Sequence, residues 1–491
     1  MFGITRAPEL DRPGLQWLNV DRPLSLQDLQ GRLVILDFWT SCSVNSLHVL
    51  PTLNKIMEAY GEDVVVIGVH SPKFDAERNP VNVLRAIERY GIRHPIVHDP
   101  QMILWDDYGI RAWPTLVIID AKGRVIGDMP GEPNPDLLVT GIGKMIQDIK
   151  ESGQLAPAPP PAVRVAPDNG DRTLKFPGKI KPLRGAGGEK SWAVADSGHH
   201  QIVILGDDGR ERRRIGSGNP GFFDGDLQGC SFNSPQGLIS ADGILYVADS
   251  GNHAIRRIDL DSGDVSTLAG TGYRGKDLQG QKAGHEVSLA SVWDLEVNGS
   301  QLYFANAGTH QIGIYDLTDH IVRPLAGNSG GDIVDGAAPE AELAQPNGLA
   351  LDDSGSTLYF ADSESSAIRS LSLDNDPQVT TLSGQDLFEF GHTNGAFSEA
   401  LFQHPMGLAV RNGGLVVADS FNGCLRQMDF HSGRVSDLGE IGFDHIDCDY
   451  RMDGEPAGVI ADGDDRLLVS DTNNHRIVEI DLKARTLRTW A

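Results

Sequence analysis

The sequence predicts two folding units, an α/β domain followed by an all-β propeller with six blades. Three observations lead to this prediction. Residues 1–150 alternate apolar strands with helical stretches, residues 151–171 are rich in proline, and residues 172–491 repeat one unit six times. A chain of 491 residues also exceeds the usual length of one compact domain.

The first 150 residues carry the pattern of an α/β sheet. Apolar runs at 33–38 and 64–69 are typical of buried strands. A helix is expected after the segment 39–51, reaching about residue 60, and another at 81–90. A further strand is expected from Pro114 to Asp120. Strands that alternate with helices in this way form layered α/β domains.

The segment between the two units reads as a linker. It contains five prolines within eleven residues, which favour an extended and semi-rigid chain. Because strand and helix alternate before it and strands with turns dominate after it, we place a domain boundary there. The prolines are Pro157, Pro159, Pro160, Pro161 and Pro167.

Composition limits the partners that the chain can have. It holds 42 Lys and Arg against 68 Asp and Glu, a formal net charge of −26. This balance disfavours nucleic acid and anionic lipid, although a basic run at 210–214 leaves RNA binding as an alternative to simple solvent exposure. The apolar runs are too short to cross a membrane, and the first residues lack a secretory apolar run. We therefore expect a cytoplasmic protein.

One unit recurs six times after the linker. Each copy contains a short apolar strand that ends in a polar residue and is followed by a turn and a second strand. Such a unit cannot bury both of its faces alone, whereas six units arranged radially can, and closing the ring protects most strand edges. The polar residues are Asp196, Asp249, Asn306, Asp362, Asp419 and Asp471, at successive spacings of 53, 57, 56, 57 and 52 residues.

The turns of these units resemble NHL repeats. Asn252-His253 and Asn474-His475 match the Asn-His of that repeat, and His200 and His310 match it in part. Repeated histidines can bind metals, but these would lie in different blades, and one metal needs all its ligands within about 2 Å. We expect them to be structural turn residues and expect no metal site.

The first domain resembles a thioredoxin fold. The matching residues are Asp37-Phe38-Trp39 before the turn and Trp113-Pro114-Thr115, where that family has a cis-proline, so Pro114 is expected to be cis. The resemblance implies a Cys-x-x-Cys pair beginning four residues after Trp39, at positions occupied here by Ser43 and Ser46. A hydroxyl without a base is a poor nucleophile and forms no disulfide.

Three interpretations of this turn remain open. The domain is a natural redox-inactive thioredoxin fold, or Cys42 acts as a lone reactive thiol, or the serines are deliberate replacements of cysteines. A small, partly buried side chain is the simpler reading of Cys42. Asp37 matches the buried acid that assists proton transfer in the family, and without thiols it is equally an interior polar group.

The combined domains resemble the family of NHL repeat-containing protein 2. The matching strings run from Phe38 to Pro51, from Gly68 to Phe74 and from Phe176 to Lys179. Members of that family often carry cysteines at the positions of Ser43 and Ser46.

We therefore predict a protein-interaction scaffold that binds a protein partner through a propeller face and uses no cofactor. The rival hypothesis is a thiol–disulfide oxidoreductase, disabled here or dependent on Cys42. A propeller enzyme such as a lyase or lactonase is third, and would need metal ligands that converge on the central axis.

Overall fold

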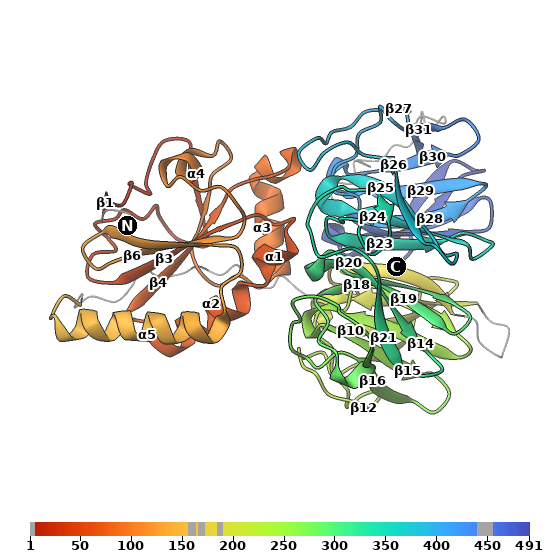
Figure 1. The fold of residues 1–491 in the computed structure, drawn as a ribbon, viewed down its shortest axis with the longest axis horizontal. Coiled ribbons are helices and arrows are strands. Elements are labelled where there is room, and N and C mark those ends of the chain that lie inside the picture. Colours follow the sequence, from red (N-terminus) through yellow and green to blue (C-terminus); the bar gives the residue numbers. More distant parts are fainter. Residues whose placement is uncertain (1–4, 156–163, 165–171, 184–189, 439–454) are drawn as a thin grey trace. The chain divides into compact units, whose positions relative to one another are not determined.

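The computed structural model describes residues 5–155, 164, 172–183, 190–438 and 455–491 (Figure 1). Contacts divide the chain into two units, Met1–Gly170 and Asp171–Ala491. The five linker prolines lie outside the described residues. Among the described helices, none is both long enough and apolar enough to span a bilayer.

The first unit is built on one mixed sheet with the strand order β1-β7-β6-β3-β4-β5-β2. The central strands β3, β4 and β5 are parallel, and the others pair antiparallel to their neighbours. Every residue of β3 and β4 is buried, as expected for strands covered on both faces. The strands are β1 (Thr5–Arg6), β2 (Gln16–Leu18), β3 (Leu33–Trp39), β4 (Val64–His70), β5 (Ile96–His98), β6 (Thr115–Ile119) and β7 (Arg124–Pro130).

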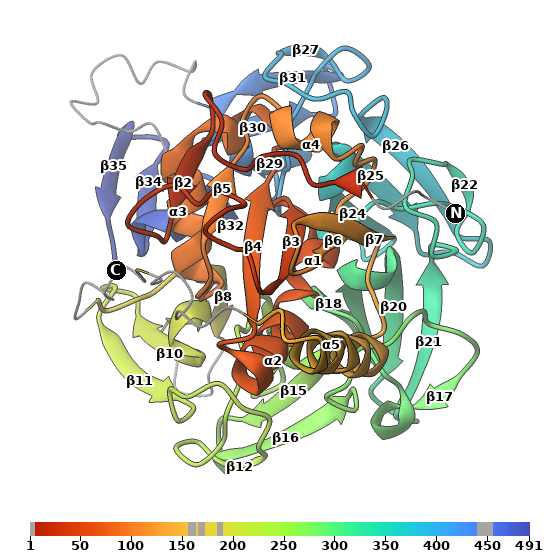
Figure 2. The same ribbon diagram turned by 90° about the vertical axis from the view of Figure 1, so that its left-hand side faces the viewer.

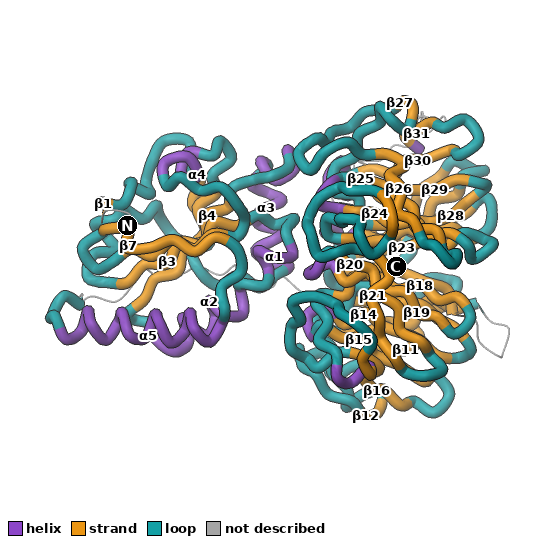
Figure 3. Tube along the Cα trace, in the orientation of Figure 1, coloured by secondary structure: helices purple, strands orange, loops and turns teal. Residues whose placement is uncertain are grey.

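Helices cover both faces of this sheet. On one face α2 and α5 pack through Leu53, Ile56, Leu138 and Ile142 against alternate residues of the central strands (Figure 3). On the other face Leu104 of α4 joins the core formed by the opposite side chains of those strands. The helices are α1 (Val44–Leu47), α2 (Leu50–Tyr60), α3 (Pro80–Arg89), α4 (Ile103–Asp107) and α5 (Pro135–Glu151), with a 3₁₀ turn η1 (Asp75–Arg78).

The segment after β3 holds two helices, and the second matches the helix expected to reach about residue 60. The short helix α1 ends at Leu47 and α2 begins at Leu50, with Pro51 in its first turn. Proline has no amide hydrogen to donate, so it is tolerated in the first turn of a helix and disfavoured within one. Pro51 is therefore suited to its place in the first turn of α2.

The second unit is a six-bladed propeller, which confirms the predicted architecture. Figure 2 shows the outermost long strands of the blades around the rim of the ring. Blades 2 to 5 each gain a two-residue outer strand, contributed by the loop that precedes the blade, which the repeat pattern did not reveal. Blade 1 comprises β8 (Pro177–Leu183), β9 (Ser191–Asp196), β10 (Gln201–Gly206) and β11 (Glu211–Ile215), and blade 6 comprises β32 (Pro456–Asp462), β33 (Arg466–Asp471), β34 (Arg476–Asp481) and β35 (Thr486–Thr489).

The middle blades follow the same antiparallel plan. Blade 2 has β12 (Gly225–Asp226), β13 (Leu238–Ala241), β14 (Ile244–Asp249), β15 (Ala254–Asp259) and β16 (Asp264–Ala269); blade 3 has β17 (Lys282–Ala283), β18 (Val292–Asn298), β19 (Gln301–Asn306), β20 (Gln311–Asp316) and β21 (Ile321–Ala326). Blade 4 has β22 (Gly336–Ala337), β23 (Pro346–Leu351), β24 (Thr357–Asp362), β25 (Ala367–Ser372) and β26 (Gln378–Ser383); blade 5 has β27 (Gly395–Ala396), β28 (Gly407–Arg411), β29 (Gly414–Asp419), β30 (Cys424–Asp429) and β31 (Arg434–Asp437).

Four repeated histidines each connect their own blade to the next one. His253 ends a 3₁₀ turn with a left-handed backbone, and its Nδ1 accepts a hydrogen bond from the backbone N–H of Ser291 at 2.9 Å. His200, His310 and His475 make the same bond, to the N–H groups of Ser234, Gln345 and Phe176. These four histidines are structural turn residues, as the sequence predicts.

The ring closes without exchanging a strand between its ends. The four-stranded sheets of blades 1 and 6 are each built from consecutive strands. The Thr472 hydroxyl donates to the Pro177 carbonyl at 2.8 Å, and His475 Nδ1 accepts from Phe176 N–H at 3.1 Å. The indole rings of Trp192 and Trp490 also meet edge to face, with 6.2 Å between their centroids. Side-chain hydrogen bonds and aromatic packing therefore hold blades 1 and 6 together.

A buried ion pair supports three of the blades. Arg256, Arg369 and Arg426 are fully buried, and each bonds the aspartate that ends the second long strand of its blade, at 2.8 to 2.9 Å. In blade 1 this aspartate is Asp196, and Arg214 donates to it at 2.6 Å. Arg214 was expected to be an exposed charge of the basic run, and this contact shows that the expectation is wrong for that residue.

Candidate functional site

The two serines lie where α1 begins. Ser43 is the N-cap residue of α1, and its Oγ accepts a hydrogen bond from the backbone N–H of Ser46 at 3.4 Å. Ser46 is 1% exposed, and its own Oγ accepts from the backbone N–H of Thr40 at 3.4 Å. Both hydroxyls therefore serve as acceptors for backbone amides of the turn, which is the usual structural role of serine at a helix start.

Cys42 lies in the same turn but is buried. Its side chain is 5% exposed, and its Sγ lies 3.5 Å from the Thr40 hydroxyl. Its backbone N–H donates to Glu77 Oε1 at 3.1 Å. A reactive cysteine needs exposure and a positive environment that favours the thiolate, whereas this one adjoins a carboxylate.

Glu77 holds the turn in place. Its Oε1 accepts from the hydroxyls of Thr40 at 2.6 Å and Ser41 at 2.7 Å as well as from Cys42 N–H. Its Oε2 accepts the backbone N–H groups of Lys73 and Phe74, each at 3.1 Å. Burial alone would raise the pKa of Glu77, but these hydrogen bonds and the nearby His70 hold its pKa well below the usual range.

Two histidines extend this network. His70 Nε2 lies 3.7 Å from Glu77 Oε1, an ion-pair distance that is too long for a hydrogen bond. His70 Nδ1 lies 3.2 Å from His98 Nδ1, and His98 Nε2 lies 3.1 Å from the Arg78 carbonyl. Burial lowers the pKa of His98 to about 4, so its ring is neutral at pH 7. The carbonyl requires a proton on His98 Nε2, so His98 Nδ1 accepts from His70 Nδ1–H.

Asp37 lies at the centre of the sheet. It is fully buried on β3 between Gly68 of β4 and Leu116 of β6. Neither carboxylate oxygen has a hydrogen-bond partner among the described residues. Burial raises the pKa of Asp37 to about 7. The acid is therefore poised to exchange a proton near neutral pH.

Pro114 has the peptide geometry that the sequence predicts. The Trp113–Pro114 bond is cis, and β6 begins at the next residue, Thr115. Thr115 pairs with Phe38 of β3, one residue after Asp37. The sheet register therefore links the Pro114 segment to the strand that leads into the serine turn.

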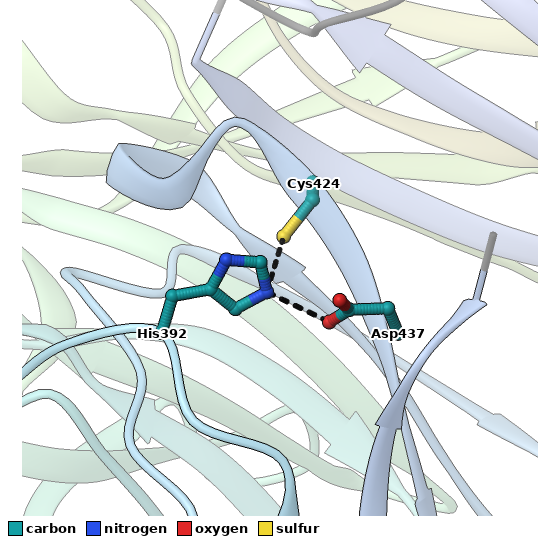
Figure 4. Close-up of side chains that lie close together, drawn as sticks. All are labelled: His392, Cys424 and Asp437. Carbon is teal, nitrogen blue, oxygen red and sulfur yellow. Dashed lines mark hydrogen bonds and ion pairs between the residues drawn. The ribbon is translucent and has the colours of Figure 1, made fainter. Parts of the chain in front are cut away.

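Two buried lysines lie on β8, the first strand of blade 1. Lys179 of β8 is 5% exposed and donates from Nζ to the carbonyls of Met406 and Ala457, and Lys181 pairs with Glu296 at 2.5 Å. Burial lowers the pKa of Lys179 to about 8. Among the described residues, the one group with metal-ligand spacing is His392, Cys424 and Asp437 in blade 5 (Figure 4).

Sequence reasoning did not single out Glu77, His98 or the blade 5 group. Glu77 lies 37 residues after Thr40, and no spacing rule connects a turn to a carboxylate on a separate loop. The sole sequence sign of the blade 5 group is that Cys424 stands where blades 2 and 4 have Ala254 and Ala367.

Comparison with known proteins defines the class. A family model described as Thioredoxin-like matches residues 31–125. The chain is 37% identical to the protein SUPPRESSOR OF QUENCHING 1, chloroplastic, of Arabidopsis thaliana, over 97% of this chain and 47% of that protein. Its thioredoxin-like region is 31% identical to the thiol-disulfide oxidoreductase ResA of Halalkalibacterium halodurans, over 21% of this chain and 56% of that protein. The class is a thioredoxin-like domain followed by an NHL-repeat propeller.

The particular family follows from one further comparison. The chain is 35% identical to human NHL repeat-containing protein 2 over 96% of this chain and 70% of that protein. It belongs to the NHL repeat-containing protein 2 family.

Proposed function

We propose that this chain is a cytoplasmic protein-interaction scaffold whose thioredoxin-like domain performs no dithiol chemistry. The observation that carries the proposal is the hydrogen bonding of Ser43 and Ser46, whose hydroxyls accept backbone N–H groups at the start of α1. Exchange of a disulfide requires a thiolate that attacks and a second thiol that resolves the mixed disulfide. Oxygen at both positions supplies neither.

The surroundings of Cys42 support the same proposal. The thiol is buried, and Glu77 accepts hydrogen bonds from the backbone of Cys42 and from the hydroxyl beside its sulfur. The lone-thiol alternative is disfavoured because reactive cysteines are solvent-accessible, whereas Cys42 is buried.

The propeller loops supply the proposed binding surface. Loops that enter blades 2, 3 and 5 expose Phe223, Tyr273 and Phe388 by 70%, 79% and 66%. Because each blade has four long antiparallel strands, the loops between blades all emerge on one face of the ring. Exposed aromatic side chains on a rigid scaffold are typical of protein-binding surfaces.

The redox part of the proposal is tested by insulin reduction with dithiothreitol, using the full chain and the Ser43→Cys/Ser46→Cys variant. We expect the chain as it stands to match the uncatalysed rate and the double variant to exceed it. Reduction by the unaltered chain that disappears in Cys42→Ser would establish the oxidoreductase instead.

The interaction part is tested by cross-linking in cell extract with the full chain and with Phe223→Ser/Tyr273→Ser/Phe388→Ser. These three side chains are exposed, so the fold should tolerate their loss. We expect the variant to lose a specific cross-linked protein. An identical cross-linking pattern would exclude this face as the binding surface.

A further inference from the structure

We propose that His392, Cys424 and Asp437 form a binding site for a divalent metal ion of the Zn²⁺ type in blade 5. The three side chains converge at the edge of the blade, as Figure 4 shows. His392 Nε2 lies 2.8 Å from Asp437 Oδ1 and 4.0 Å from Cys424 Sγ, and the three ligand atoms lie within 4.8 Å of one another.

These spacings suit a tetrahedral ion. Bonds of about 2.0 to 2.3 Å from zinc to nitrogen, oxygen and sulfur place neighbouring ligand atoms roughly 3.3 to 3.6 Å apart. The separations of 2.8 and 4.0 Å from His392 lie about half an ångström on either side of that range, and the Cys424–Asp437 separation, which is at most 4.8 Å, closes by up to about 1.3 Å when the ion binds. Imidazole, thiolate and carboxylate together are a ligand set typical of zinc.

Comparison of the blades shows that the group is not a feature of the repeat. Strand pairing aligns Cys424 with Ala254 and Ala367, since each residue faces the aspartate that ends the preceding strand. His392 lies three residues before the glycine that begins the outer strand of its blade, where blades 2 and 4 have Phe222 and Ile333. Two positions that are apolar in blades 2 and 4 therefore both carry potential metal ligands in blade 5.

Asp437, the third proposed ligand, also pairs with the buried arginine of its blade. In blades 2 and 4 the buried arginine pairs with a loop aspartate, Asp224 or Asp335, at 2.8 to 2.9 Å. In blade 5 the loop residue is Asn394, and the carboxylate lies instead on the last strand, as Asp437, 2.7 Å from Arg426 Nε. This exchange preserves a partner for Arg426, but it accounts for neither His392 nor Cys424.

The site is accessible and its charge is balanced. The His392 side chain is 44% exposed, so an ion can enter and water can fill a fourth position. The positive charge of Arg426 is also compensated by Asp419, at 2.9 Å. On binding, the Cys424 thiol releases a proton to solvent, the neutral His392 imidazole carries its proton on Nδ1 so that Nε2 can bind the ion, and the His392–Asp437 hydrogen bond is replaced by two bonds to the metal.

The test uses Co²⁺ as a spectroscopic substitute for Zn²⁺ with the full metal-free chain. We expect one Co²⁺ per chain, a near-ultraviolet thiolate-to-cobalt band and visible bands of tetrahedral intensity, all displaced by Zn²⁺. The variant His392→Phe/Cys424→Ala reproduces the apolar pair of blade 2, so it should fold. We expect it to lose the thiolate band and to bind Zn²⁺ at least about tenfold more weakly.

Two matched controls keep the result interpretable. Cys42→Ser removes a thiol from the other unit, and His431→Ala removes an exposed histidine from blade 5; both should bind Co²⁺ normally. Zn²⁺ should also raise the melting temperature of the propeller in the unaltered chain and not in His392→Phe/Cys424→Ala. Absence of the thiolate band in the unaltered chain, or its persistence in that double variant, would overturn the proposal.

Discussion

The Oε1 atom of Glu77 lies 2.6 Å from the hydroxyl of Thr40 and joins two parts of the thioredoxin-like domain that are 37 residues apart. Through this atom and Oε2, one buried carboxylate accepts hydrogen bonds from the serine turn and from the loop that follows β4. Because several donors would otherwise be left buried without an acceptor, the turn depends on the charge and on both oxygens of this side chain.

Glu77→Gln should destabilise the domain and loosen the turn. The amide replaces one acceptor oxygen with a donor that faces other donors, which should cost about 2 to 4 kcal/mol. Calorimetry of the full chain measures the loss, and hydrogen exchange should show faster exchange in a peptide that spans residues 40–47. Glu58→Gln changes an exposed glutamate of α2 and serves as the control. Unchanged hydrogen exchange in Glu77→Gln would show that the turn keeps its structure without the Glu77 carboxylate.

Asp37 should make stability depend on pH. Burial raises the pKa of Asp37 to about 7, so between about pH 4 and 7 the folded domain keeps a proton that the unfolded chain releases. Stability should therefore fall as pH rises through this window, by at most about 4 kcal/mol. Asp37→Asn should abolish this part of the pH dependence.

The comparison is made by denaturant unfolding of the first domain at pH 5 and pH 8. Asp37→Asn should be the more stable protein at pH 8, and the difference should shrink at pH 5. The exposed Asp128 on β7 provides a control, since Asp128→Asn should follow the unaltered chain at both pH values. Parallel profiles for Asp37→Asn and the unaltered chain would mean that Asp37 ionises normally.

Removing the buried Arg369 should be costly unless Asp362 is neutralised as well. Arg369 is fully buried and lies 2.8 Å from Asp362, so Arg369→Met leaves a buried carboxylate without its cation, at a cost of about 3 to 5 kcal/mol. Blade 3 has Asn306 and Gly313 at the two corresponding positions and has no such pair. Arg369→Met/Asp362→Asn should recover part of the loss in thermal unfolding. Equal melting temperatures for the single and double variants would contradict this account.

His475 should contribute to closure of the propeller. His475→Ala leaves the Phe176 N–H without its acceptor and removes an edge-to-face contact between the two rings, whose centroids are 4.4 Å apart. A loss of about 1 to 3 kcal/mol in propeller stability is expected. His431→Ala, in an exposed turn of blade 5, should have little effect when both are measured by urea unfolding. If the two variants lose the same stability, His475 has no special part in closure.

Local patterns were sufficient to predict much of the architecture. Blade strands such as β14 and β15 were predicted because alternating apolar residues and turn residues occur within short stretches of chain. The placement of Ser43 at a helix start and of Pro114 before a strand followed from motifs whose members are adjacent in sequence.

Contacts between distant segments could not be predicted in this way. Glu77 beneath the serine turn, the histidine bonds between blades and the group of His392, Cys424 and Asp437 each join residues from separate loops and strands. Neighbouring residues encode the propensity of a segment to form a strand, helix or turn. Which side chains meet depends on how those segments pack, since packing alone brings a carboxylate within hydrogen-bond distance of a turn 37 residues away.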